Sequence, residues 1–146
     1  MKIGVRIKKL NENAVIPTYY NDWASGADIY ACMGGDTVIP AGETVMIHTG
    51  IAMEVPIGCA GLVYARSGIA SSRGLAPANK VGVIDSDYRG EIIIAMHNHS
   101  KQDAVIVDGE RIAQFIVSPM VIADFELVDE LEPSARGEGG FGSTGI

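Results

Sequence analysis

The chain has 146 residues, of which 47% are hydrophobic and 20% charged, the balance of a single globular domain with one core. A formal net charge of −7 without a basic cluster argues against a surface that tracks a nucleic-acid backbone. No apolar run approaches the roughly 20 residues of a membrane-spanning helix, and two cysteines are too few for a disulfide framework or a four-cysteine zinc site. We therefore expect an intracellular protein, cytoplasmic by default, that binds neither membranes nor nucleic acid directly; a nucleus or a virus-infected cell fits the same composition.

Short apolar segments recur along the chain. Residues 1–10 interleave Lys and Arg with Ile and Val, which predicts a first strand and not a signal peptide. Further extended segments, separated by Gly, Pro and Asp turn signals, are residues 27–31, 37–40, 44–47, 50–55, 61–65, 102–107, 112–117 and 125–128. The best helix candidate begins at Ser67 or Gly68 and ends near Arg73, with Gly74 placed to terminate it. The pattern predicts an all-β sandwich, barrel or jelly roll over residues 1–132, followed by a Gly-rich tail over residues 133–146 that is mobile unless a ligand orders it.

The stretch GVIDSDYRGEI, residues 82–92, holds the first candidate for chemistry. Two apolar runs flank a short polar turn, which predicts a β-hairpin with a bulge or a longer loop. Asp85 enters at the end of the first run, where a strand holds a general base on a rigid element. The alternative is a plain turn, because Asp, Ser and Gly favour chain reversals.

The stretch YARSGIASS places Arg66 and Ser67 at the start of the short helix. Ser67 either caps this helix or contributes its hydroxyl to an anion site. In the second case Arg66 adds a planar donor fork, and the helix start adds backbone N–H groups for phosphate.

The C-terminal RGEGGFGSTG matches G-x-G-x-x-G, but only four residues follow Gly142, too few for the helix of a dinucleotide-binding fold. It is either a flexible tail or a lid. As a lid, its glycines would let backbone N–H groups approach phosphate, and Phe141 would stack on a base.

Three polar features stand inside apolar segments. Gln114 interrupts the strand candidate 112–117, where it needs a partner or an edge position, and Arg111 stands at the mouth of that strand. Asp28 in SGADIYA is either a turn acid or a ligand that holds a hard cation directly or through water. His97 and His99 share one face of a strand but lack a visible third ligand, so neutral imidazoles are expected there and not a metal site.

Five of these stretches, in this order and spacing, resemble the trimeric deoxyuridine triphosphatases (dUTPases): SGADIYA, ARSGIA, NKVGVIDSDYRGEI, GERIAQ and RGEGGFGSTG. The resemblance runs from Ser25 to the C-terminus. It implies a distorted, β-clip-like jelly roll with one short helix. It also implies a homotrimer in which all three chains build each active site.

The resemblance also implies roles for individual positions. Asp85 matches the general base that activates water, and Tyr88 matches the platform under the deoxyribose that leaves no space for a 2′-hydroxyl. Asp28 matches the acid that holds Mg²⁺ through water. The remaining matches are Asn79, Gly82, Ile84 and Met96 to the uracil slot, Arg66, Ser67, Gly68 and Gln114 to the phosphate-binding positions, and Arg136, Phe141, Gly142, Ser143 and Thr144 to the closing tail.

The implied reaction is hydrolysis of dUTP to dUMP and pyrophosphate, by in-line attack of water on the α-phosphorus with Mg²⁺ on the triphosphate. This reaction supplies dUMP and limits the incorporation of uracil into DNA. Two alternatives stand beside it: a dCTP deaminase on the same fold, with or without pyrophosphatase activity, and a non-catalytic nucleotide-binding module. The deaminase needs an acid–base group beside C4 of the base, and residues 79–84 contain no acidic residue. The presence of Asp28, Asp85 and Gln114 favours an enzyme over a module.

Overall fold

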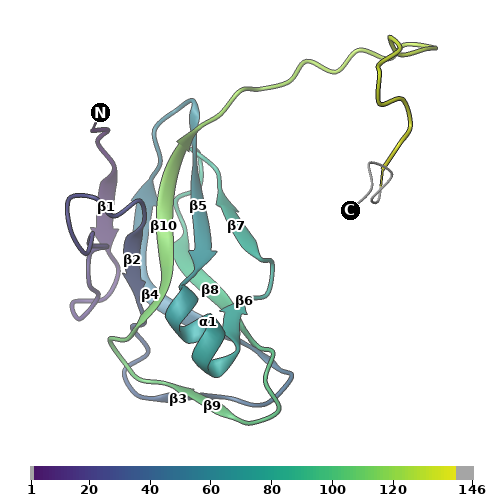
Figure 1. Ribbon diagram of the computed structural model, residues 1–146. Helices are drawn as coiled ribbons and strands as arrows, with labels where there is room; N and C mark the ends of the chain where they lie inside the picture. The colour runs from purple at the N-terminus through teal and green to yellow at the C-terminus, as the bar shows by residue number, and fades with distance from the viewer. Residues whose placement is uncertain (1, 141–146) are drawn as a thin grey trace.

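The computed structural model describes residues 2–140 and has an all-β architecture with one short helix (Figure 1). Its elements are β1 (Arg6–Lys9), β2 (Ala27–Tyr30), β3 (Thr37–Ile39), β4 (Thr44–Glu54), β5 (Cys59–Ala65), α1 (Ser67–Arg73), β6 (Leu75–Pro77), β7 (Val81–Ile84), β8 (Glu91–Asn98), β9 (Ala104–Ile106) and β10 (Arg111–Pro119). The predicted all-β class is confirmed, and so is the helix, which ends at Gly74 with a left-handed φ of 68°. No helix in the described chain has the length and apolar character needed to cross a membrane.

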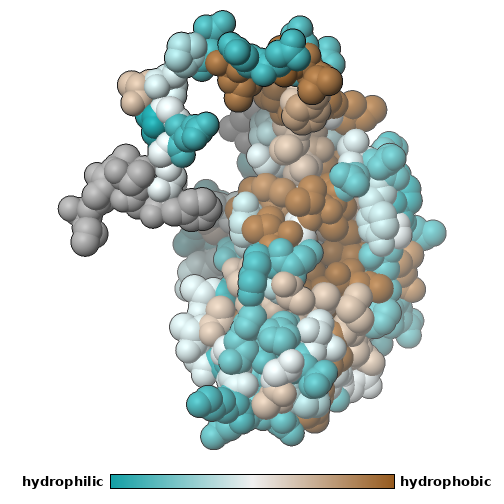
Figure 2. Space-filling view, turned by 90° about the vertical axis from the view of Figure 1, so that its right-hand side faces the viewer, coloured by the Kyte–Doolittle hydropathy of each residue, from teal (hydrophilic) through white to brown (hydrophobic). Residues whose placement is uncertain are grey.

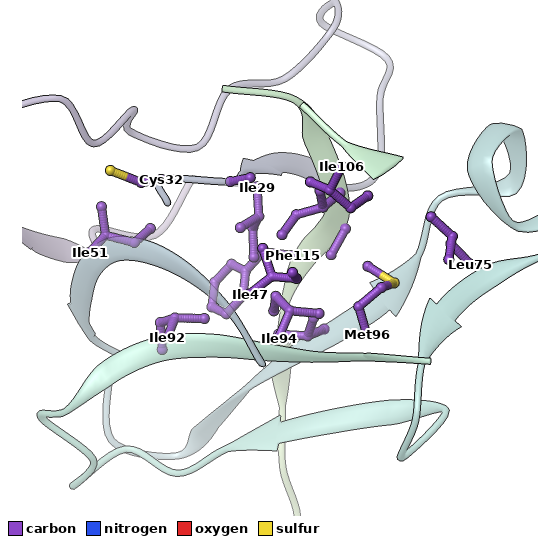
Figure 3. Packing of buried hydrophobic residues seen from close by; sticks show 14 of the residues in the cluster. Ile29, Cys32, Ile47, Ile51, Leu75, Ile92, Ile94, Met96, Ile106 and Phe115 are labelled. Atoms are coloured by element: carbon purple, nitrogen blue, oxygen red, sulfur yellow. The ribbon is translucent and has the colours of Figure 1, made fainter. Parts of the chain in front are cut away.

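The strands form two four-stranded antiparallel sheets, ordered β1-β4-β8-β6 and β2-β10-β5-β7, and a small sheet of β3 and β9. Strand β8 shows how the sequence builds the core: Ile92, Ile94, Met96 and Asn98 alternate with more exposed residues, as expected for a strand with one buried face. Ile92, Ile94 and Met96 pack against Ile47 of β4 and other buried residues (Figure 3). Each fully buried side chain of this size stabilises the fold by about 1.5–3 kcal/mol.

The predicted hairpin over residues 82–92 is wrong. Strands β7 and β8 belong to different sheets, because β7 pairs with β5 whereas β8 pairs with β4 and β6. The turn between them is real, since the Tyr88 N–H donates to the Asp85 carbonyl at 3.2 Å. As a result, β7 is the last strand of its sheet, and no described strand bonds its second edge.

Three other boundaries differ from expectation. The predicted strands 44–47 and 50–55 are one strand, β4 (Thr44–Glu54), because the chain passes Gly50 (φ 66°) as an irregularity within the ladder to β8. Strand β6 was not predicted, because it is only three residues long, and it forms by pairing with β8. Residues 125–128 form no strand: Phe125 is 93% and Leu127 100% exposed, and the chain here leads away from the sheets (Figure 1).

Candidate active site

A cavity of about 440 Å³ opens where β2, β10 and the start of α1 meet. It brings together five of the predicted site residues, from segments that are far apart in the sequence. The lining residues are Tyr20, Ala24, Ser25, Gly26, Asp28, Arg66, Ser67, Gly68, Arg111 and Gln114. The sequence patterns for a cation ligand, an anion site and a polar strand residue therefore describe one site.

Asp28 is the organising group of this cavity. Its side chain is only 12% exposed, and it accepts a hydrogen bond from Arg66 Nε at 2.8 Å on one oxygen and from Arg111 at 3.2 Å on the other. Arg66 also donates to the Arg111 carbonyl at 3.2 Å. A buried carboxylate is costly unless it is paired, so Asp28 fixes both guanidinium groups. Arg111, at the mouth of β10, thus bonds a carboxylate of the neighbouring strand β2.

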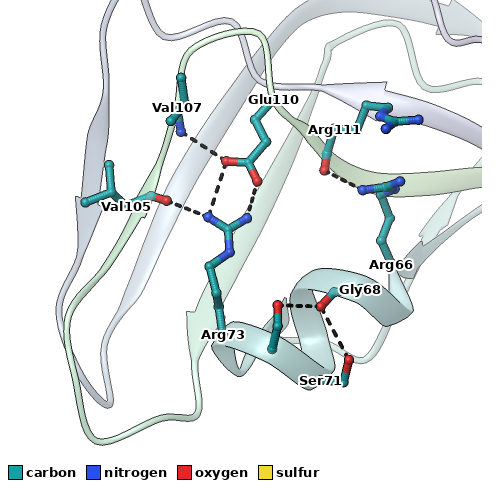
Figure 4. A network of polar contacts seen from close by, with 9 residues as sticks. Arg66, Gly68, Ser71, Arg73, Val105, Val107, Glu110 and Arg111 are labelled. Atoms are coloured by element: carbon teal, nitrogen blue, oxygen red, sulfur yellow. Dashed lines mark hydrogen bonds and ion pairs between the residues drawn. The ribbon is translucent and has the colours of Figure 1, made fainter.

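The helix start presents Ser67 and Gly68 to the cavity, but Ser67 is not a cap. Arg66 holds the capping position with extended backbone, and no side chain caps the helix. Ser67 is the first helical residue and is exposed, so its hydroxyl is available to a ligand. At the other end of the helix, Arg73 forms an ion pair with Glu110 and donates to the Val105 carbonyl at 2.7 Å (Figure 4). This network fastens α1 to the turn that leads into β10.

Gln114 is held by an unusually close backbone approach. Its Nε2 donates to the Ala65 carbonyl at 2.9 Å, and a Cβ on Gly26 would lie 2.7 Å from its Oε1. Strand β10 lies between β2 and β5, so the alternative of an edge position is wrong. Gly26 was not predicted as a site residue, although it lies inside the SGADIYA motif, and only the three-dimensional packing reveals its role.

A second group of predicted residues lies around the connection between β7 and β8, and none of its members lines the cavity. Asp85 is exposed at the end of β7. The Tyr88 hydroxyl donates to the Glu91 carbonyl at 2.9 Å. Asn79 is exposed on the loop before β7, with its side chain next to buried Gly82. Ile84 is partly buried against the core, and Met96 is fully buried, so only the Met96 backbone can face a ligand.

The two histidines, in β8 and the following turn, lie close together. Their ring centroids lie 4.3 Å apart, but no three His, Cys, Asp or Glu side chains of residues 2–140 converge on one point. His97 Nδ1 lies 2.9 Å from Thr44 Oγ1, and His99 Nε2 lies 3.4 Å from Lys80 Nζ. Desolvation and the nearby charges of Lys80 and His97 lower the pKa of His99, which agrees with the expected neutral imidazole.

Of the predicted tail residues, Arg136 lies in a turn and donates to the Gly139 carbonyl at 2.7 Å. This part of the chain extends away from the sheets (Figure 1). Phe141, Gly142, Ser143 and Thr144 lie outside the described residues.

These features define an all-β protein with an arginine-lined cavity suited to an anionic ligand. The family model described as dUTPase matches residues 12–145. The chain is 43% identical to the deoxyuridine 5′-triphosphate nucleotidohydrolase of Syntrophotalea carbinolica, over 99% of this chain and 98% of that relative. It is 44% identical to the protein of the same name from Desulfitobacterium hafniense, over 100% of this chain and 97% of that relative. The dUTPase of Staphylococcus bacteriophage 80alpha, solved with dUPNHPP, superimposes with a TM-score of 0.90 at 28% identity and covers 99% of this chain and 100% of that chain. The chain belongs to the dUTPase family.

Proposed function

We propose that this protein hydrolyses dUTP to dUMP and pyrophosphate. The observation that carries the proposal is the cavity in which Asp28 holds Arg66 and Arg111 beside the start of α1, in a member of the dUTPase family. A triphosphate brings about four negative charges to a chain with a net charge of −7, so fixed cations and donors must offset them. Arg66, Ser67, Gly68 and Gln114 bind the phosphates.

Asp85 removes the proton from the water that attacks the α-phosphorus. Its exposure just after β7 supports this role, because the carboxylate is accessible yet directly follows a paired strand. A positioned base contributes about 10²–10⁴-fold to the rate. Uracil lies against the second edge of β7, near Gly82 and Asn79, where backbone donors and acceptors read its N3–H and carbonyls. Cytosine presents the opposite pattern and would leave buried groups unpaired. Thymine shares the pairing edge of uracil and is excluded by lack of space at C5.

Asp28 would hold Mg²⁺ through water when the triphosphate is bound. The described residues contain no group of three potential ligands, and Asp28 offers one carboxylate whose two oxygens already accept hydrogen bonds from arginines. This donor set does not fit a metal site made of protein ligands alone. It fits a hydrated cation that would contact Asp28 through water and would be bound mainly by the substrate. When bound, Mg²⁺ supplies positive charge that offsets the triphosphate.

The active unit is a homotrimer with shared sites. One support is that Asp85, Tyr88 and Asn79 stand outside the cavity of their own chain, so a complete site needs another copy. A second support is exposed apolar surface. Figure 2 shows a band of hydrophobic residues along one face. A hollow of about 650 Å³ includes the exposed side chains of Ile3 and Tyr19 in its lining.

The C-terminal tail closes over the bound nucleotide. Phe141 stacks on the base, and Arg136, Gly142, Ser143 and Thr144 contact the phosphates. Deletion of residues 136–146 should lower turnover by more than it lowers the melting temperature. A large fall in melting temperature would instead identify the tail as a strap between subunits.

The deciding assay measures pyrophosphate release from each deoxynucleoside triphosphate with and without Mg²⁺. We expect release from dUTP alone, dependent on Mg²⁺. Ammonia release from dCTP would identify a deaminase, and dUTP binding without pyrophosphate release would identify a binding module. Light scattering coupled to size exclusion tests the trimer, and a monomer with full activity would exclude a shared site.

A further inference from the structure

The side chain of Glu91 binds to the backbone of β4 at an irregularity in that strand. The β4–β8 ladder shifts register between His48 and Ala52, and Gly50 takes a left-handed φ of 66° there. One Glu91 oxygen accepts the N–H groups of Gly50 at 2.8 Å and Thr49 at 3.2 Å. The other oxygen lies 2.9 Å from His48 Nδ1. The carboxylate thus satisfies backbone groups that the ladder leaves without a partner.

The geometry keeps this carboxylate ionised. Burial alone raises the pKa of Glu91, but hydrogen bonds from His48 and from the Gly50 and Thr49 backbone outweigh burial and lower it. The Thr49 hydroxyl also donates to the Ile92 carbonyl, the next residue of β8. The first residues of β8 are therefore fastened to β4 by side chains as well as by the ladder.

The same residue holds the ring of Tyr88 through its backbone. The Tyr88 hydroxyl donates to the Glu91 carbonyl at 2.9 Å. The ring lies directly over Gly90, where a Cβ would come within 2.4 Å of the hydroxyl oxygen. The position of the Tyr88 ring therefore depends on the Glu91 carbonyl and on the close approach of Gly90. A shift of the backbone at residues 90 and 91 would move the ring.

We propose that His48 and Glu91 are positioning residues that set the Tyr88 ring and, through it, the selection of deoxyribose over ribose. The inference rests on the proposed function, in which Tyr88 lies under the sugar. Neither side chain needs to touch the substrate. Glu91 fixes the position of the first residues of β8 relative to β4. His48 contacts the Glu91 carboxylate from the solvent side, and the His48 side chain is 49% exposed.

The test compares kcat/KM for dUTP with kcat/KM for UTP. Glu91→Ala and His48→Ala should lower this ratio about tenfold or more, because displacements of about 1 Å in a site have effects of up to about 10²-fold. Glu91→Gln and His48→Asn retain a hydrogen-bonding atom at the same place and should stay near the wild-type ratio. Thr44→Val is the matched control, because it removes a side-chain hydrogen bond between β4 and β8, to His97, at the opposite end of the ladder from Glu91.

A uniform loss of activity toward both nucleotides, together with a lower melting temperature, would show that the pair only stabilises the fold and would overturn the proposal. Crystal structures of the two alanine variants decide the positioning step without any turnover: a Tyr88–Glu91 hydrogen bond unchanged from the wild type overturns it. A wild-type protein that releases no pyrophosphate overturns the proposed function instead, and with it the role in sugar selection.

Discussion

The close approach between Gly26 and Gln114 leads to a quantitative prediction for Gly26→Ala. The new Cβ would lie 2.7 Å from Gln114 Oε1 and 3.0 Å from Gln114 Cβ. The amide can rotate away, but Cβ is fixed to the backbone of a central strand. We expect the loss of the hydrogen bond to Ala65, about 0.5–1.5 kcal/mol, and overpacking of about 1–3 kcal/mol. The free energy of unfolding should fall by about 2–4 kcal/mol, which lowers the melting temperature of a chain of this length by roughly 5–15 °C.

The assay is thermal denaturation at one fixed protein concentration, since subunit association makes the melting temperature depend on concentration. Gly35→Ala is the matched control, because a Cβ there meets nothing within 4 Å. Gln114→Ala should recover part of the loss when combined with Gly26→Ala, since it removes the amide but keeps its own Cβ. Pyrophosphate release should fall with Gly26→Ala because Gln114 leaves the cavity. Wild-type stability and turnover in this variant would refute the reasoning.

Three further predictions concern charged groups. Asp85→Asn should lower pyrophosphate release by about 10²–10⁴-fold while dUTP still binds by calorimetry; unchanged turnover would remove Asp85 from the role of base. Because the pKa of Glu91 is lowered in the fold, its ionised form stabilises the protein above the unfolded pKa of about 4.3, and this contribution disappears as pH falls through the folded pKa. The stability advantage of wild type over Glu91→Gln, measured by urea unfolding, should therefore shrink from pH 5 toward pH 3, and a constant difference would contradict the lowered pKa of Glu91. Lys80→Gln should raise the pKa of His99 in an NMR titration, because a nearby positive charge is removed, whereas the distant Lys8→Gln should leave it unchanged; equal titrations in all three proteins would rule out the contact with Lys80.

The sequence by itself determined the features that depend on a few neighbouring residues. Alternation along EIIIAMHN predicts one buried face of β8, and Gly74 predicts where α1 ends, since few other residues adopt its φ of 68°. Turn residues mark the reversal after Asp85. Asp28, Arg66, Asp85 and Gln114 could also be named, because each is a polar group in an unexpected place within a short motif, whereas Asn79, Tyr88 and Met96 were named only through the family resemblance.

Only the tertiary structure decided which segments pair and which polar groups meet. The apolar runs on either side of Asp85 are suited to a hairpin, yet β7 and β8 join different sheets, because the choice of partner depends on strands far away in the chain. The same long-range packing gives Asp28 two arginines, brings Gln114 against Gly26, and inserts Glu91 into the irregularity of β4. Local patterns specify how a segment buries its side chains, whereas its partner is chosen by the free energy of the whole assembled core, which no short stretch contains.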